Sequence, residues 1–518
     1  MDSVPLPIDD RIDMDNAPSQ TEDRISRDRL RMYSAGPAGI SAAAHLRNSP
    51  AAHGVDFEIT VFEAGLWIGG QLAQFGPVSD GGRPVFPYDD STLGPLSAED
   101  VAGPALLWGN PLFTRSSEDI LGGGAVEFFD LPSQQVGYYS RDRREYVLST
   151  TRPYDQTPTG DWLRLIWRYG PSVWNQRGLL VESWNLRERM AANAAPSEAA
   201  AAEAAAIADV SGILASLLGA TELAHEGAPE ALHRHGVSDA YTVEVLAPQV
   251  ECGPQVQRIP VMSALALAMA AGREDAGYVH GGGDYAARAW EIAKRLGADV
   301  RLDSKVVGIE RERADGGDEE TSTAARWLLR HEGGGAEAEA FDKVIVAAPG
   351  LEGLVFCAAG VNSSIEAEAV EFDAVHVTFF TASGLPARFG GGGWWVPSQV
   401  LFVDDDAGIH EVTYVREVIR YNGDGAVDGA PVLEHLYRCV SGTDISEMLL
   451  SDPEVTWMHH RRFDHAYPLT YPRTWYPSLA VGDGLWTTAP IYSVGSSLDL
   501  SWLAGRVVAQ QVIETVKK

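Results

Sequence analysis

The sequence predicts an α/β fold in which a domain built on a parallel sheet is joined to a second, α+β domain. Three observations predict it: a glycine-rich turn between a strand and a helix, a second strand that ends at an acidic residue, and a later stretch of alternating apolar residues. With 518 residues, the chain is long enough for two or three domains and a large core.

The first observation lies in "RLRMYSAGPAGISAAAHLRN", residues 29–48. Its apolar start predicts a short strand, and residues 40–47 predict a helix. Between them, Gly36 and Gly39 hold the second and third positions of the G-x-G-x-x-G fingerprint that cradles a dinucleotide pyrophosphate, whereas Ser34 stands at the first. A lone turn of this kind also occurs as a tight strand-to-helix connection in other α/β proteins.

The second strand, residues 57–62, ends at Glu63, where a carboxylate would hold the ribose hydroxyls of an adenosine. We expect this carboxylate to bind both hydroxyls and to be partly accessible to solvent without a ligand. A second glycine pair, Gly69 and Gly70, follows in "WIGGQL" and lets the backbone approach a pyrophosphate. Two glycine turns flanking an acid-terminated strand predict FAD rather than NAD.

The charge of the chain excludes some classes of partner. Its 40 basic and 72 acidic residues give a formal net charge of −32, which disfavours nucleic-acid binding and membrane docking through a basic patch. The longest apolar run, 261–272, is too short to span a bilayer, so we expect no stable membrane insertion. Residues 1–28 have the composition of a disordered acidic leader and no signal peptide. These features predict a soluble, cytoplasmic protein.

Four segments follow one another in an order that resembles the prenylcysteine oxidase (prenylcysteine lyase) family, in a form like its fungal members. The segments are 163–180, 243–271, 277–312 and 483–514. The most specific points are the W-R-Y-G at Trp167 to Gly170 and the run of three glycines that ends at Asp284. The resemblance runs from about residue 29 to the end of the chain.

This resemblance implies a Rossmann-like FAD-binding domain of the amine-oxidase and glutathione-reductase type, with a second α+β domain for the substrate. The FAD-binding domain would be discontinuous, formed by residues 29–120, 255–350 and 480–518. The substrate domain would have a helical part at 121–254 and a β-rich part at 351–479.

The resemblance also implies cofactor contacts. Val306 would offer its backbone to the adenine, while Ser497 and Asp499 lie at the start of a C-terminal helix that begins near the flavin ring. A helix N-terminus at that place would stabilise negative charge on a reducing flavin.

Three departures from the family's pattern fall on the pyrophosphate side. Ser34 replaces the first glycine, Gln71 stands where the family has an arginine that contacts the phosphates, and Arg31 occupies a small apolar position in a buried strand. We expect the chain to retain FAD, but to bind it more weakly than an intact fingerprint would.

The second domain should contact the substrate. The alanine-rich segment 191–219 is interpreted as a solvent-facing helix pair, and the alternating apolar residues of 372–480 predict a sheet. Some of its many aromatic residues could line a long apolar pocket, which fits a family that handles prenyl chains.

Histidines are frequent in this half, and the segment "WMHHRRFDHAYP" holds three of them. We select His465 and Tyr467 as catalytic candidates in the pocket. A metal site formed by His459, His460 and His465 is the other interpretation of the same segment, although the family needs no metal.

Two functions remain open from the sequence. The first is an FAD-dependent oxidase that oxidises a lipophilic, prenyl- or polyketide-like small molecule with molecular oxygen as the acceptor, in fungal secondary metabolism. The alternative is a protein that keeps the fold with a degenerate cofactor site and acts as a non-redox isomerase or cyclase, or as a ligand-binding protein.

Overall fold

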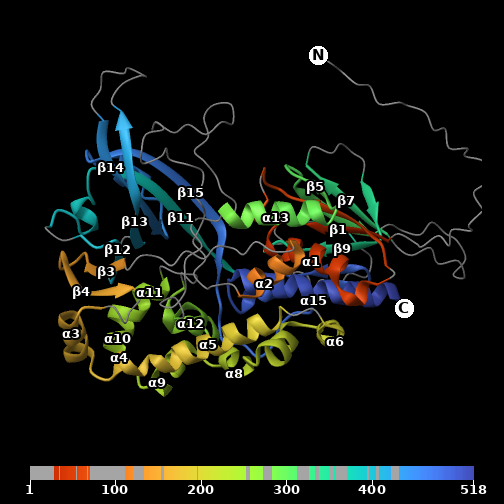
Figure 1. Cartoon of the computed structure of the whole chain (residues 1–518), viewed down its shortest axis with the longest axis horizontal. Coiled ribbons are helices and arrows are strands. Elements are labelled where there is room, and N and C mark those ends of the chain that lie inside the picture. Colours follow the sequence, from red (N-terminus) through yellow and green to blue (C-terminus); the bar gives the residue numbers. More distant parts are fainter. Residues whose placement is uncertain are drawn as a thin grey trace, which may run out of the picture.

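In the described part of the chain, the computed structural model contains three β-sheets and a layer of helices (Figure 1). Ser34, Gln71 and residues 1–27 of the predicted leader lie outside the residues that the structure describes, as do the side chains of Arg31 and Asp284. The described residues are 28–33, 35–53, 55–66, 68–70, 111–121, 134–152, 157–194, 197–251, 257–271, 283–311, 326–332, 338–349, 355–357, 370–393, 396–403, 408–421 and 431–517.

The first sheet has six strands and brings together distant parts of the chain. Its order is β16 (Ala480–Gly482), β17 (Leu485–Thr487), β9 (Lys343–Val346), β1 (Asp28–Tyr33), β2 (Phe57–Phe62) and β5 (Asp299–Arg301). All neighbours pair in parallel except β16 and β17. Because β1 lies between β2 and β9, its carboxyl end is the point where the strand order reverses, which is where such sheets bind ligands.

Two helices far apart in sequence cover this sheet side by side. The helices α1 (Pro37–Asn48) and α15 (Leu498–Lys517) run in the same direction. Two hydrogen bonds show this: Ser41 Oγ donates to the Trp502 carbonyl at 2.5 Å, and, further along both segments, Ser49 Oγ donates to Gln510 Oε1 at 3.1 Å. A Cβ atom on Gly505 would collide with the Ala38 carbonyl oxygen, so the close contact requires glycine.

The helix α13 (Gly283–Arg295) packs beside α1, and α2 (Pro111–Leu121) packs against α13 and α15. The helix α13 ends just before Gly297, whose φ of +65° favours glycine. Next to the first sheet lies a four-stranded sheet with the order β10 (Val355–Cys357), β6 (Val306–Arg311), β7 (Trp327–His331) and β8 (Glu339–Phe341).

A seven-stranded sheet forms the other end of the molecule (Figure 1). Its order is β15 (Val455–Pro468), β11 (Phe372–Ala382), β14 (Pro431–Ser441), β13 (Ile409–Tyr421), β12 (Gln399–Phe402), β3 (Gln134–Ser140) and β4 (Glu145–Arg152). The strands β3 and β4 correct the prediction that 121–254 is helical. Their sequences, "QQVGYYS" and "EYVLSTTR", are rich in β-branched and aromatic residues, and β3 joins the sheet by parallel pairing with β12.

Helices from the middle of the chain form a layer along one side of both large sheets (Figure 1). They are α3 (Thr159–Tyr169), α4 (Ser172–Asn175), α5 (Arg177–Ala192), α6 (Glu198–Ala206), α7 (Val210–Gly212), α8 (Thr221–His225), α9 (Ala228–Arg234), α10 (Asp239–Tyr241), α11 (Ala247–Glu251) and α12 (Ala264–Ala271). None of the helices in the described ranges is long and apolar enough to cross a membrane.

The alanine-rich segment is not the solvent-facing helix pair predicted from its composition. Ala204, on α6, is fully buried in the same core cluster as α15, and so are Ile213 and Leu214. Small alanine side chains let α6 lie close to α15, a packing role that composition alone does not distinguish from a solvated helix.

Candidate functional site

Glu63 is placed at the carboxyl edge of the six-stranded sheet, directly after β2. Its Oε2 accepts a hydrogen bond from the Ala35 N–H at 2.8 Å, and its Oε1 accepts one from the Gly65 N–H at 2.9 Å. The residue is only 8% exposed, so the expectation of partial solvent access is wrong. Burial raises the pKa of this carboxyl, and the surrounding backbone N–H groups offset part of that effect.

The two glycine turns pack directly against each other at this edge. The Gly69 N–H donates to the Ala35 carbonyl at 3.2 Å, and the Cβ position of Gly70 lies 3.7 Å from Gly36 Cα. Gly69 and Gly70 have φ values of +119° and +58°, a backbone conformation that favours glycine. The glycine pair is therefore required for the loop to approach the turn before α1.

Two helix N-termini point to the same edge because α1 and α15 are parallel. Gly36, which has no side chain to cap the helix, is the N-cap of α1, and the first turn of α1 has no acidic residue. On α15, Ser497 Oγ accepts a hydrogen bond from the Leu500 N–H at 3.0 Å. Both helices direct the positive ends of their dipoles toward this region, which favours an anionic group.

Asp499, in the first turn of α15, binds the N-terminus of a neighbouring helix. Its two oxygens accept hydrogen bonds from the Leu112 and Phe113 N–H groups, at 3.1 and 3.0 Å, at the N-terminus of α2. The side chain is fully buried, and desolvation raises its pKa to about 7 despite these two bonds. Asp499 thus joins α15 to α2 at the same end of both helices.

Val306 begins β6 in the neighbouring four-stranded sheet and is 2% exposed. It belongs to the same apolar cluster as Phe62, the last residue of β2. Two residues earlier, the Ser304 N–H donates to the Glu63 carbonyl at 2.9 Å. The structure therefore brings Val306 to the end of β2, beside Glu63.

Thr488 is a polar group of this edge that the sequence analysis missed. It follows β17, its N–H donates to the Val346 carbonyl at 3.0 Å, and its side chain is fully buried. Its Oγ1 has no hydrogen-bond partner within the described part of the chain. A buried hydroxyl without a partner at a ligand-binding edge fits a polar ligand there. The only sequence signal is the pair of threonines at the end of "LWTT".

The catalytic candidates His465 and Tyr467 lie near the end of β15. The rings of His465 and Phe372 are 5.3 Å apart, and the Phe372 ring lies 5.8 Å from that of Tyr492, in the turn that precedes α15. Aromatic contacts therefore connect His465 to the region where α15 begins. Tyr467 is 6% exposed and pairs with Asp373 across the strands.

One face of the seven-stranded sheet (the apolar face) carries a cluster of buried apolar residues, with the Arg438–Glu411 ion pair beside it. Residues of β11, β13, β14 and β15 form this cluster, to which none of the described helices contributes a residue. Its members are Val375, Val377, Phe379, Val418, Leu436, Val440, Phe463, Ala466 and Tyr467. The cluster reaches Tyr467, two residues from His465 on β15.

A hollow of about 600 Å³ lies at the opposite edge of the same sheet, over β4. Charged side chains, including Arg144, Glu145 and Asp161, line it. Its charged lining and its distance from β15 separate it from the apolar face.

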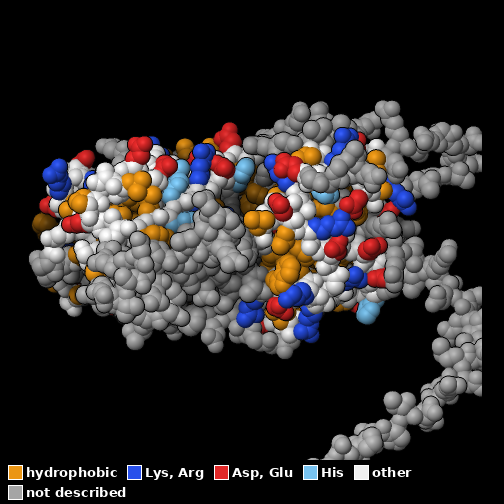
Figure 2. All heavy atoms as spheres, turned by 90° about the horizontal axis from the view of Figure 1, so that it is seen from above, with side chains coloured by type: hydrophobic (Ala, Val, Ile, Leu, Met, Phe, Trp, Pro, Cys, Tyr) orange, Lys and Arg blue, Asp and Glu red, His pale blue; other side chains and the backbone are white. Residues whose placement is uncertain are grey.

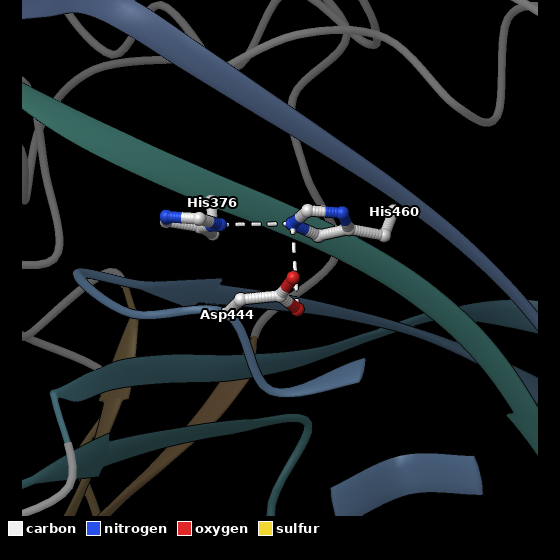
Figure 3. A group of neighbouring side chains, drawn as sticks. All are labelled: His376, Asp444 and His460. Carbon is white, nitrogen blue, oxygen red and sulfur yellow. Dashed lines mark hydrogen bonds and ion pairs between the residues drawn. The ribbon is translucent and has the colours of Figure 1, made fainter. Parts of the chain in front are cut away.

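The histidines of β15 do not form the metal site considered for His459, His460 and His465. Because side chains alternate along a strand, His459 and His460 point to opposite faces of the sheet. His460 instead meets His376 of β11 and Asp444 of the turn after β14 (Figure 3). Burial and the neighbouring His460 lower the pKa of His376.

Comparison with known proteins identifies the family. A sequence model of the family described as Prenylcysteine lyase matches residues 158–518. The chain belongs to the prenylcysteine lyase family. The match includes the β-rich half, Val306 and the C-terminal helix, whereas both glycine turns precede it. Family and fold together identify the chain as a flavin-dependent oxidoreductase. No curated protein matches the chain in sequence.

Solved structures show the fold. Cyclohexylamine oxidase from Brevibacterium oxydans IH-35A has a TM-score of 0.53 at 12% identity, over 95% of this chain and 100% of that one. A double mutant of putrescine oxidase has a TM-score of 0.52 at 12% identity, over 94% and 99%. A CLA-producing fatty acid isomerase from P. acnes has a TM-score of 0.50 at 12% identity, over 94% and 98%. The predicted fold class is confirmed.

Proposed function

We propose that this member of the prenylcysteine lyase family binds FAD at the carboxyl edge of the six-stranded sheet and oxidises a lipophilic small molecule. The observation that carries the proposal is the convergence there of both glycine turns, Glu63 and two parallel helix N-termini. When bound, the flavin would accept a hydride from a carbon beside a heteroatom or at an allylic position and would pass two electrons to molecular oxygen, giving hydrogen peroxide.

The side chains at this edge fit such a cofactor by their chemistry. The carboxylate of Glu63 still has lone pairs for ribose hydroxyls after accepting two backbone N–H groups. The N-terminus of α1 suits a pyrophosphate, and Thr488 Oγ1 offers a buried hydroxyl that lacks a partner in the described chain. Val306 and Ser497 lie at the same end of the fold, as the family pattern implies.

The substrate would lie on the apolar face of the seven-stranded sheet. This cluster is buried and reaches Tyr467, two residues from His465, while the Arg461 guanidinium lies against Phe463 on the same face. An apolar floor of this length suits a prenyl- or polyketide-like chain, and it excludes water from the bond that reacts. His465 would move a proton to or from the substrate, since its ring reaches the start of α15 through Phe372 and Tyr492.

The predicted domain limits form part of this proposal. The six-stranded sheet takes strands from each of the ranges 29–120, 255–350 and 480–518, which supports a discontinuous FAD-binding domain. The proposed role in fungal secondary metabolism rests only on the similarity of the sequence to fungal members of the family.

One observation favours the non-redox alternative. Both oxygens of Glu63 already accept backbone hydrogen bonds, so the carboxylate holds the turn together without any ligand. A chain that has lost FAD could therefore keep this edge and use the apolar face for isomerisation, cyclisation or ligand binding.

The test begins with the purified full chain. Under the proposal it shows flavin absorption bands, and denaturation releases FAD. Glu63→Ala should lower FAD affinity by about tenfold or more, because a charge-assisted hydrogen bond is worth about 1.5–3 kcal/mol. The same change should also cost stability, since it leaves the Ala35 and Gly65 N–H groups without this acceptor.

The control is Glu58→Ala, an exposed glutamate on the same strand, which should leave flavin content unchanged. Equal flavin content in the two variants would remove Glu63 from the site. A wild-type chain that stays colourless after incubation with FAD would instead favour the non-redox alternative.

A further inference from the structure

A cluster of three side chains able to bind a metal lies on the seven-stranded sheet, outside the proposed flavin site. His376 Nδ1 and His460 Nε2 are 2.9 Å apart, and Asp444 Oδ1 lies 3.8 Å from His460 Nε2 (Figure 3). One donor atom from each residue lies within 4.8 Å of the other two. The two imidazole rings are nearly parallel, with an interplanar angle of 19°.

Strand register fixes the two histidines on one face of the sheet. In the antiparallel pair of β11 and β15, His376 is opposite Arg462 and His460 is opposite Thr378. The histidines are therefore diagonal neighbours whose side chains point the same way. A register shift of one residue would move His460 to the other face.

Asp444 reaches the histidines from the other side of β11. It lies in the turn between β14 and the short helix α14 (Ser446–Leu450), and β14 is the neighbour of β11 opposite β15. The Ser446 N–H donates to Asp444 Oδ1 at 2.8 Å and orients the carboxylate. Two neighbouring strands and the turn that follows a third thus direct one donor each to a common point.

We propose that His376, His460 and Asp444 bind one divalent transition-metal ion of the Zn²⁺ class, with water as the fourth ligand. Metal–donor distances of about 2.0–2.2 Å in a tetrahedral site place the donor atoms about 3.3 Å apart. The separations of 2.9 and 3.8 Å lie on either side of that value, so small side-chain rotations complete the site. Two imidazoles and one carboxylate suit Zn²⁺, whereas Mg²⁺ and Ca²⁺ prefer oxygen ligands only.

The surrounding charges permit a cation. Arg462, which is opposite His376, forms an ion pair with Asp464 at 2.7 Å. Arg461 points to the other face, where its guanidinium lies 4.6 Å from the centre of the Phe463 ring. Positive charge near the site is therefore paired or directed away from it.

The ion would reach the site from solvent. The Asp444 side chain is 55% exposed and that of His460 is 22% exposed. Histidine side chains are visible at the surface of the lobe that holds the seven-stranded sheet (left in Figure 2). A bound ion would fasten the turn and α14 to β11 and β15. Along β11 the site lies roughly 13 Å from Phe372, four residues away, so it is independent of the flavin edge.

The experiment titrates the full chain, first treated with EDTA, with Zn²⁺ in a calorimeter and with Co²⁺ in a spectrophotometer. We expect one equivalent of Zn²⁺ to bind with a dissociation constant in the micromolar range or below, and Co²⁺ to give the visible absorption of a tetrahedral site. His376→Gln, His460→Gln and Asp444→Asn should each weaken Zn²⁺ binding about tenfold or more.

The matched control is His459→Gln, which removes a neighbouring histidine from the opposite face and should leave Zn²⁺ affinity unchanged. If a histidine variant fails to fold, the proposal is tested by Asp444→Asn, which changes an exposed turn, and by the Co²⁺ spectrum of the wild-type chain. Absence of stoichiometric Zn²⁺ binding, an octahedral Co²⁺ spectrum, or equal affinity in wild type and Asp444→Asn would overturn the proposal. These results do not depend on flavin content.

Discussion

The two large sheets bring their functional groups together in different ways. At the edge of the six-stranded sheet the groups are mainly backbone N–H groups, glycines and helix ends, contributed by strands and helices from both ends and the middle of the chain. On the seven-stranded sheet they are side chains on neighbouring antiparallel strands. The first kind of site leaves a local sequence signature, whereas the second depends on strand register.

The largest effect on the six-stranded half is expected from Gly505→Ala, because this half depends on close backbone packing. The added methyl group would collide with the Ala38 carbonyl and separate α1 from α15, at a cost of about 3–4 kcal/mol in the free energy of unfolding. Flavin retention should fall with it, and urea denaturation followed by circular dichroism measures the stability. Gly160→Ala on α3, whose Cβ would meet open space, should cost nothing. Equal stability of the two variants would contradict the close packing.

Asp499→Asn tests the buried carboxylate that joins α15 to α2. The pKa of Asp499 rises from 3.8 to about 7, so the folded state binds a proton more strongly than the unfolded state. This group therefore stabilises the fold most below pH 4, and that stabilisation is lost as the pH rises toward 7, by about 4 kcal/mol in all. The variant should lack this loss, measured as urea midpoints at pH 5 and pH 8. Asp119→Asn, exposed on α2, should retain it.

Ser34→Gly combined with Gln71→Arg should strengthen the cofactor edge without affecting the seven-stranded sheet. Restoring the first glycine and a positive charge should raise FAD affinity about tenfold for each ~1.4 kcal/mol regained. Flavin retained through gel filtration provides the measurement. If the double variant remains colourless, Arg31 becomes the next residue to replace.

Thr488→Val should have two small effects of opposite sign. Removing a buried hydroxyl that has no partner in the described chain should raise stability without ligand by about 1 kcal/mol, while FAD affinity falls several-fold. Thr487→Val is the matched control, because Thr487 Oγ1 already accepts the Ala489 N–H at 3.2 Å and its loss should only destabilise. A loss of stability in Thr488→Val would show that its hydroxyl is satisfied by the protein.

In the six-stranded half, the sequence alone predicted those features whose residues lie close together in the chain. Gly36, Glu63, Gly69 and Gly70 lie within 35 residues of one another, and their spacing predicted the turns that the structure contains. The accessibility of Glu63 was wrong because no sequence rule indicates that the Ala35 and Gly65 N–H groups would bury it. Thr488 was missed because its lack of a partner is a property of the packed edge.

In the seven-stranded half, the alternation of apolar residues predicts strands but not which strands pair or in which register. Alternating apolar residues predicted the strands, but His376 and His460 are 84 residues apart and meet only through the register of β11 and β15. Neighbours in sequence, such as His459 and His460, are separated by the sheet itself. The role of Asp499 likewise depended on where α2 begins, a position far from it in sequence.

The parallel contact of α1 with α15 has a consequence for biosynthesis. Ser41 finds its partner 461 residues later in the chain, and β1 pairs with β9 more than 300 residues after it. At a synthesis rate of about 5–20 residues per second, the first strand and helix wait roughly 20–90 s before the segment that covers them leaves the ribosome. During that time their apolar faces are exposed to aggregation, so we expect the yield of folded protein to depend on chaperones and on slow expression at low temperature.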